Sequence, residues 1–355
     1  MNIKIFAVVT ILLFSHVALA TKIILIIPDK KGPGFWSMVH QVSAVSAKSL
    51  DVQLEVIYGG ANRFATLEII ENIVARPIKP DYLIFRPFHG NAVNVFDQIE
   101  ARGISFVTLE QAFSGKEAIE LQQPKQKYQH WIGEVTYDNP SGGELLLNTL
   151  LKEQRIRNPA TIPSIIGIGG DFDNLSISRQ QVLTNLDRSG DEHLNQVFPT
   201  YWDPNNVTTN FAMMLERYPN TNIFWCAGDQ LALETLKQFQ LLSDKPIVVG
   251  GFDWLPEALL KIQQGEYTAS VGGHFLMGAI AITKILDYQH GIDRFLIPQK
   301  FYDFEVITKE NVDIYVDFMK QKKWKEVNFN QFSAFKMGHE PQAITMQNII
   351  KSIKE

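Results

Sequence analysis

The sequence is poor in the residues on which several classes of protein depend. It contains a single cysteine, Cys226, among 355 residues. One cysteine cannot form an intramolecular disulfide, and it excludes a zinc or iron–sulfur site built from cysteines alone. The eight histidines are scattered along the chain without the spacing of metal ligands. We therefore expect neither a metal nor another cofactor.

Positive charge is also scarce. Lysine and arginine number 33 against 38 aspartate and glutamate residues, which gives a net charge of −5. Nucleic-acid binding requires a basic face for phosphate contacts, so this balance argues against a nucleic-acid partner. The hydrophobic fraction of 45% is ordinary for a globular protein. At roughly 100–200 residues per domain, the length predicts about two domains.

Long apolar runs do not occur after the first 20 residues. At the N-terminus, Lys4 precedes an apolar run over 5–13, and Val17-Ala18-Leu19-Ala20 offers an A-x-A cleavage site. This pattern is typical of a secretory signal peptide. The run is short for a hydrocarbon layer of ~30 Å, which argues against a membrane anchor. We predict cleavage after Ala20 and export to the periplasm.

Two series of alternating strands and helices follow. Strands are predicted at 22–27, 52–58, 81–85, 104–109 and 130–133, and again at 164–168, 196–200, 222–226, 246–250 and 267–271. Helices are predicted at 35–50, 66–75, 92–101, 142–154, 177–187, 207–217, 230–239, 256–264 and 275–288. Such alternation indicates βαβ units and parallel sheets. The predicted fold class is α/β, with two doubly wound, Rossmann-like lobes and a ligand cleft at the carboxyl ends of their strands.

Aromatic, charged and amide side chains gather after these predicted strands. The candidate ligand-binding residues are Phe35, Trp36, Arg86, Glu110, Asn174, Arg179, Trp202, Asp253 and His274. Aromatic faces pack on the C–H faces of a sugar ring, and arginine, aspartate and asparagine form directional hydrogen bonds with hydroxyl groups. The set therefore predicts a small, polar, sugar-like ligand.

Structural roles are open for several of these residues. Phe35 and Trp36 could pack into the core at the start of a helix. Arg86 could pair with Glu110, because a buried guanidinium without a partner is costly. Arg179 could bridge the lobes or face solvent.

The turn after the predicted strand at 246–250 is similarly ambiguous. Asp253 could bind a ligand or cap the helix that begins near Pro256. Its neighbour Trp254 could reach a ligand or pack against the surface of the lobe.

Six stretches, in order, resemble the type 1 periplasmic binding proteins of the ribose-binding and autoinducer-2-binding class. They are Gly34-Phe35-Trp36, 80–87, 137–143, 226–232, 248–253 and 307–312. The resemblance covers about residues 22–315. It implies two lobes joined by a three-strand hinge, with crossings near 134, 272 and 303. The first lobe would comprise 21–134 and 273–302, and the second 135–272 and 303–355.

The resemblance also implies roles for individual residues. Phe35, Trp36 and Trp202 match aromatic positions that sandwich a sugar ring, and Asp253 matches an aspartate that binds hydroxyl groups. Four places depart from the family pattern. The family's ligand-binding arginine before the second-lobe helix is displaced, with Arg179 at a nearby position, and Gly228 replaces the asparagine before Asp229. Glu110-Gln111 stands where an Asp-Arg pair is common, and Gly273-His274 replaces a glutamine at the last crossing. A typical pentose or hexose is therefore not implied.

The expected function is that of a monomeric solute-binding protein that presents its ligand to the permease of an ABC transporter. An alternative is a receptor that signals to a membrane histidine kinase or chemoreceptor. A third is an exported α/β enzyme, although no carboxylate pair can be assigned the acid and base roles of a glycosidase. The tail at 324–355 lies beyond the resemblance, with an amphipathic helix predicted at 341–353. It would strap one lobe or dock a partner.

Overall fold

The computed structural model describes residues 20–60, 63–110, 113–186, 192–295 and 301–354. Apart from Ala20, the predicted signal peptide lies outside these residues. Within the described ranges, no helix is both long and apolar enough to cross a membrane.

The first lobe contains a sheet of five parallel strands in the order β2-β1-β3-β4-β5 among the described residues. Its strands are β1 (Lys22–Ile27), β2 (Gln53–Tyr58), β3 (Tyr82–Phe85), β4 (Ser105–Leu109) and β5 (Trp131–Val135). Its helices are α1 (Phe35–Ser49), α2 (Arg63–Val74), α3 (Ala92–Arg102), α4 (Gly115–Leu121) and α10 (Met277–Gln289). α10 comes from much later in the chain and packs against α1 and β3 to β5.

The second lobe contains a six-stranded sheet in the order β11-β10-β9-β8-β6-β7. Its strands are β6 (Ser164–Gly169), β7 (His193–Pro199), β8 (Ile223–Cys226), β9 (Val248–Phe252), β10 (Ala269–Gly272) and β11 (Glu305–Thr308). Its helices are α5 (Asn139–Arg157), α6 (Asn174–Asn185), α7 (Pro204–Arg217), α8 (Asp229–Leu242), α9 (Pro256–Gln264) and α11 (Val312–Gln321). Only the edge pairing of β11 with β10 is antiparallel among the pairings described in this sheet.

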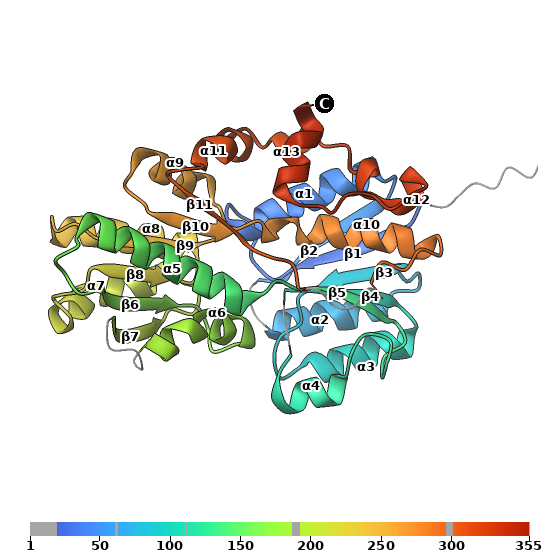
Figure 1. Ribbon diagram of the computed structural model, residues 1–355. Helices are drawn as coiled ribbons and strands as arrows, with labels where there is room; N and C mark the ends of the chain where they lie inside the picture. The colour runs from blue at the N-terminus through green and yellow to red at the C-terminus, as the bar shows by residue number, and fades with distance from the viewer. Residues whose placement is uncertain (1–19, 61–62, 111–112, 187–191, 296–300, 355) are drawn as a thin grey trace, which may run out of the picture.

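The burial of β1 shows why its sequence is apolar from Ile23 to Ile27. Leu25 and Ile27 face one hydrophobic core, whereas Ile24 and Ile26 face the other. Successive residues of a strand point to opposite faces, so a strand covered by helices on both sides has no polar face. The predicted α/β class with two parallel-sheet lobes is confirmed (Figure 1).

The chain passes between the lobes at the predicted hinge. It leaves β5 for α5 through 136–138, and it returns from β10 to α10 through η2 (His274–Leu276). The segment at 301–304 then leads into β11. Tyr137 and Tyr302 form an isolated parallel bridge, and the Tyr302 N–H donates to the Thr136 carbonyl at 2.9 Å. The first and third crossings are therefore hydrogen-bonded neighbours.

The tail takes a course that the sequence did not predict. It forms η3 (Lys323–Glu326), η4 (Phe329–Phe332), α12 (Ala334–Met337) and α13 (Met346–Lys354). η3 contacts both α11 and α1, η4 contacts α1, and α12 contacts α10. We expected 303–355 to belong to the second lobe, but η4 and α12 lie on the first (Figure 1, red).

The last helix is also shorter than the predicted 341–353. It begins at Met346, and residues 341–345 are not helical. The hydroxyl of Thr345 accepts a hydrogen bond from the Asn348 N–H at 3.2 Å. A threonine in this position satisfies one of the N–H groups that the first helical turn leaves without a partner, and so it starts the helix.

Candidate ligand-binding site between the lobes

A buried ion-pair cluster joins the two lobes. Arg86 follows β3, and its Nε lies 3.3 Å from Oε2 of Glu110, which follows β4. Its other end forms an ion pair with Asp173 of the second lobe. The ring of Phe88 lies 5.1 Å from the guanidinium. The suggested pairing of Arg86 with Glu110 is thus confirmed, and a carboxylate from the opposite lobe completes it.

Asp173 has a second role as the N-cap of α6. Its Oδ1 accepts a hydrogen bond from the Ser176 N–H at 2.8 Å. Burial alone would raise its pKa, but the charge of Arg86 and the hydrogen bonds from Ser176 and Arg86 outweigh burial and hold the pKa below its usual value. Asp173 is therefore ionised and ties the start of α6 to the first lobe. We missed it as a site residue, although a carboxylate three residues before Ser176 is an N-cap signal.

Arg179 lies fully buried on α6, close to this cluster. Its Nε donates to Oδ1 of Asn139 at 3.0 Å, and its Nη1 donates to the Ala227 carbonyl at 2.9 Å. The guanidinium lies 4.2 Å from the ring centroid of Phe252. Its Nη2 is buried without a hydrogen-bond acceptor within the described part of the chain. An enclosed donor of this kind is suited to a ligand hydroxyl.

The charge of Arg179 couples it to three carboxylates of the site. Burial lowers its pKa, and the negative charges of Asp253, Glu110 and Asp173 oppose that shift. Burying a guanidinium without a counter-charge is costly. The three carboxylates offset this cost because they stabilise the charged form of Arg179. The solvent-facing alternative for Arg179 is wrong, because its side chain is 1% exposed.

His274 forms the floor of the site at the second crossing. Its ring stacks on Phe35 at 4.3 Å, and Tyr137 and Phe304 from the other two crossings lie 5.8 and 5.0 Å away. Burial lowers the pKa of His274 to about 3, so the ring is neutral at neutral pH. Among the described residues, neither ring nitrogen has a hydrogen-bond partner, although Nε2 lies 3.2 Å from Oδ1 of Asp253. The neutral His274 ring therefore presents one N–H donor and one nitrogen lone pair within a largely apolar wall.

The first-lobe aromatics lie beside this floor. Phe35 and Trp36 are half-buried at the start of α1, with ring centroids 5.3 Å apart in an edge-on arrangement. Both also pack against the hydrophobic core. Phe35 presents one face to His274, so the structural and ligand-facing interpretations of this pair are compatible.

Asp253 faces His274 from the second lobe. Burial raises its pKa to about 7. It does not cap α9, because the N-cap is Leu255 and no side-chain hydrogen bond is made there.

A second aspartate lies behind Asp253. Asp229 is fully buried and accepts hydrogen bonds from the Tyr267 and Ser270 hydroxyls. Burial and the nearby Asp253 raise the pKa of Asp229 well above its usual value, although its hydrogen bonds from Leu255, Tyr267 and Ser270 oppose that shift.

Trp202 covers a glycine-lined edge of the second lobe. A Cβ atom on Gly170 would lie 2.4 Å from its ring, and one on Gly228 would lie 3.7 Å from it and 3.2 Å from Oδ2 of Asp253. Trp202 and Asp253 therefore flank the same glycine.

Trp254, in contrast, is buried, and its Nε1 donates to a backbone carbonyl at 3.0 Å. The packing interpretation of Trp254 is correct.

Unusual backbone conformations mark the same strand ends. Five residues other than glycine have positive φ there: Glu110 (62°), Tyr201 (54°), Trp202 (61°), Asp253 (110°) and Trp254 (58°). Such conformations cost of order 1–3 kcal/mol each and are concentrated at functional sites. The strain falls where β4, β7 and β9 end, which supports these loops as the site.

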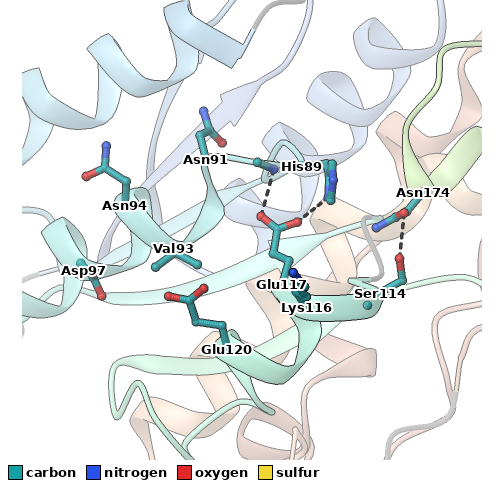
Figure 2. Close-up of a pocket in the computed structure, with 12 residues that line it drawn as sticks. His89, Asn91, Val93, Asn94, Asp97, Ser114, Lys116, Glu117, Glu120 and Asn174 are labelled. Carbon is teal, nitrogen blue, oxygen red and sulfur yellow. Dashed lines mark hydrogen bonds and ion pairs between the residues drawn. The ribbon is translucent and has the colours of Figure 1, made fainter.

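Asn174 lies apart from the central groups. Its Oδ1 accepts a hydrogen bond from the Ser114 hydroxyl of the first lobe at 2.9 Å. It lines the edge of a cavity of about 770 Å³ between α3 and α4, where Figure 2 shows His89 paired with Glu117. Arg179, Asp253 and His274 do not line this cavity. The partly enclosed polar groups lie nearer the hinge, so we place the site there.

The described ranges hold no group of three or more histidine, cysteine, aspartate or glutamate residues placed to bind a metal ion. Arg179 Nη2 and the ring nitrogens of His274 are buried polar atoms that can form hydrogen bonds with a ligand. The thiol of Cys226 is buried, and burial raises its pKa, so it is not a nucleophile at neutral pH.

Several solved structures share the fold. A periplasmic sugar-binding protein from Pseudomonas fluorescens matches with a TM-score of 0.81 at 20% identity, covering 93% of this chain and 99% of the other. An ABC transporter solute-binding protein from Actinobacillus succinogenes with bound D-allose has a TM-score of 0.72 at 20% identity, with coverage of 83% and 100%. The Caulobacter myo-inositol-binding protein has a TM-score of 0.68 at 18% identity, with coverage of 84% and 96%.

At these identities the likeness establishes the fold alone. No match was found among curated protein sequences. A family model described as a periplasmic binding protein domain matches residues 23–291, which include both sheets except β11. The chain therefore belongs to the periplasmic binding protein family.

Proposed function

We propose that the mature chain captures a neutral, sugar-like molecule by closing its lobes and then presents it to the permease of an ABC transporter. The observation that carries this proposal is the set of buried polar groups between the lobes. Arg179 Nη2 and the ring nitrogens of His274 lack hydrogen-bond partners among the described residues and lie near Asp253. Buried polar atoms are normally satisfied, so a ligand with hydroxyl groups is the natural complement.

The type of ligand follows from the balance of charge. The cation of Arg179 is offset by the carboxyl groups of Asp253 and Glu110, which leaves little net charge for an ionic ligand. Phe35, Trp36 and Trp202 supply apolar faces. Two of the similar structures named above carry D-allose and myo-inositol, both of which are neutral polyhydroxyl compounds.

Closure would supply the affinity. Phe35 and Trp36 belong to the first lobe, whereas Arg179, Trp202 and Asp253 belong to the second. A ligand that contacts both sets binds the closed arrangement more tightly than the open one, so it shifts the population toward closure. None of these steps breaks a covalent bond, and the family consists of solute-binding proteins without enzymatic activity. We assign this chain no catalytic role.

The proposal also includes export of the chain and a partner in the membrane. Cleavage after Ala20 would release a monomer into the periplasm, where the closed lobes present a composite surface to the permease. A receptor that signals to a membrane histidine kinase or chemoreceptor would use the same closure, so the first test addresses the ligand.

The test is a thermal-shift screen of residues 21–355, refolded beforehand to release any carried-over ligand. The panel contains pentoses, hexoses, sugar acids, polyols, purine nucleosides and autoinducer-2 with borate. A ligand at 100 times its Kd adds about 2.7 kcal/mol to stability, which shifts the midpoint by several degrees. We expect a shift with one class of neutral compound and no shift for the Asp253→Ala variant. If no compound in the panel shifts the midpoint, or if the Asp253→Ala variant shows an equal shift, the proposal is contradicted.

A further inference from the structure

The tail forms a connection between the lobes in addition to the three hinge crossings. α11 packs against α9 and so belongs to the second lobe. η4 and α12 pack against α1 and α10 of the first lobe. The chain therefore crosses between the lobes within 322–328. Lys322 reverses its direction after α11 with a φ of 54°.

Trp324 lies at the centre of this crossing. Its side chain is 1% exposed, and its ring centroid lies 6.0 Å from those of Phe318 on α11 and Phe275 in η2. The indole thus touches an element of the second lobe and the second hinge crossing at once. Phe275 directly follows His274, the floor of the ligand site. Within the described chain the indole N–H has no hydrogen-bond acceptor, so packing holds the ring in place.

A buried carboxylate anchors the tail to the first lobe. Asp287 of α10 is fully buried and accepts hydrogen bonds from the Ser333 hydroxyl at 2.5 Å and from the N–H groups of Ala334 and Phe335 at 3.1 and 3.0 Å. Arg294 compensates its charge at 3.2 Å. Breaking so many bonds to a buried charge is costly, so this anchor moves with α10.

Further contacts extend the anchor over the surface of the first lobe. Arg294 also donates to the Phe332 carbonyl at 3.1 Å. The ring of Phe335 stacks on His290 at 3.4 Å. Lys336 pairs with Asp51 at 3.1 Å, just after the end of α1. The tail beyond 328 is therefore fixed to the first lobe, while α11 is fixed to the second.

We propose that this tail is a strap that favours the closed arrangement of the lobes, with Trp324 as the contact through which it acts on the hinge. Closed here means the arrangement in which Arg86 meets Asp173 across the cleft. Within the tail, the short segment at 322–328 is the part that would absorb a rotation of one lobe against the other. Opening separates Phe318 from Phe275 and exposes part of the indole, which costs apolar contact. The inference does not depend on the identity of the ligand.

The test measures the distance between the lobes without added ligand. Cys226 is buried, so spin labels can be directed to cysteines introduced by Glu71→Cys on α2 and Gln240→Cys on α8, both exposed positions. Double electron–electron resonance on refolded protein gives the distribution of distances. The variants are Trp324→Leu and Phe335→Ala. The second removes a ring that is 40% exposed, so the fold should tolerate it.

We expect both variants to add or enlarge a population at longer distance. The matched control is Phe96→Leu, which removes a buried ring from the other core of the first lobe, away from the tail. It should lower the melting temperature without changing the distances. An unchanged distribution in folded Trp324→Leu would overturn the strap, as would an unchanged distribution in Phe335→Ala if Trp324→Leu does not fold. Because no ligand is added, a failed ligand screen would leave this result unaffected.

Discussion

Arg86 of the first lobe and Asp173 of the second form an ion pair across the cleft. Asn174, the residue after Asp173, makes a second contact between the lobes by accepting a hydrogen bond of 2.9 Å from the Ser114 hydroxyl (Figure 2). Arg86 also keeps Glu110 on its own lobe at 3.3 Å. One guanidinium is therefore shared between an internal partner and a partner that it meets only when the lobes are together.

The first prediction concerns Asp173→Asn. Asparagine caps a helix as well as aspartate, so α6 should keep its start, but the charge that pairs with Arg86 is lost. We expect a loss of stability of about 1–3 kcal/mol, the range for a hydrogen bond to a charged group. We also expect a larger radius of gyration in small-angle X-ray scattering.

The matched control for this variant is Asp203→Asn. Asp203 caps α7 through the Asn205 N–H at 3.0 Å, and it is exposed. It should change neither the radius nor the stability appreciably. Equal radii for Asp173→Asn and the wild type would show that the ion pair does not hold the lobes together.

The second prediction is a pH dependence that arises from Asp253. Burial raises its pKa to about 7 in the folded protein, against about 3.9 in an unfolded chain. Between these values the folded protein holds a proton that the unfolded chain has lost. The contribution of Asp253 to the free energy of unfolding therefore falls as the pH rises from about 4 to about 7.

The variant Asp253→Asn lacks this proton equilibrium. Its stability relative to the wild type should increase between pH 5 and pH 8 in urea denaturation of the ligand-free protein. A difference that stays constant over this range would mean that the carboxyl group is not penalised by burial.

The third prediction is that Trp36→Ala weakens ligand binding by roughly 1–3 kcal/mol, the scale of a lost buried aromatic contact. Isothermal titration calorimetry with the compound that emerges from the screen would measure it. Phe64→Ala is a suitable control, because Phe64 is an aromatic residue of the same lobe that is 69% exposed. A control that loses as much affinity as Trp36→Ala would argue against the proposed site.

The fourth prediction concerns the packing of α5 against α6. A Cβ atom on Gly143 would lie 1.8 Å from the Arg179 carbonyl oxygen, so Gly143→Ala must push α6 away. Arg179 would move with it. We expect a severe loss of stability in thermal denaturation, of about 3 kcal/mol or more, as for overpacking that displaces backbone. Asn148→Ala, on the exposed side of α5, should be nearly neutral.

Most of the fold could be predicted because its strands are buried on both faces. The strand predicted at 22–27 coincides with β1, since its five residues after Lys22 are all buried and apolar. The strand at 196–200 was harder to place, because β7 is a half-buried edge strand that already begins at His193. β11, α11 and the path of the tail were missed because their partners are far away in the sequence.

The candidate site was predictable as a set of strand ends but not as a set of contacts. Arg86, Glu110, Arg179, Asp253 and His274 lie close enough to affect one another, as the rule for parallel sheets requires. The sequence could not show that Asn174 lies at the rim, because that depends on the Ser114 contact from the other lobe. Asp173 was missed as a site residue for the same reason.

The strained loops at the ends of β4, β7 and β9 affect the entropic cost of ligand binding. Glu110, Trp202 and Asp253 have positive φ values there, and Trp202 packs closely against Gly170. Ordering a flexible side chain on binding costs about 0.5–1.5 kcal/mol, and a preorganised site avoids most of that cost. The strain in these loops lowers the stability of the folded protein. In return, the conformational entropy lost when the ligand binds comes mainly from the relative motion of the two lobes.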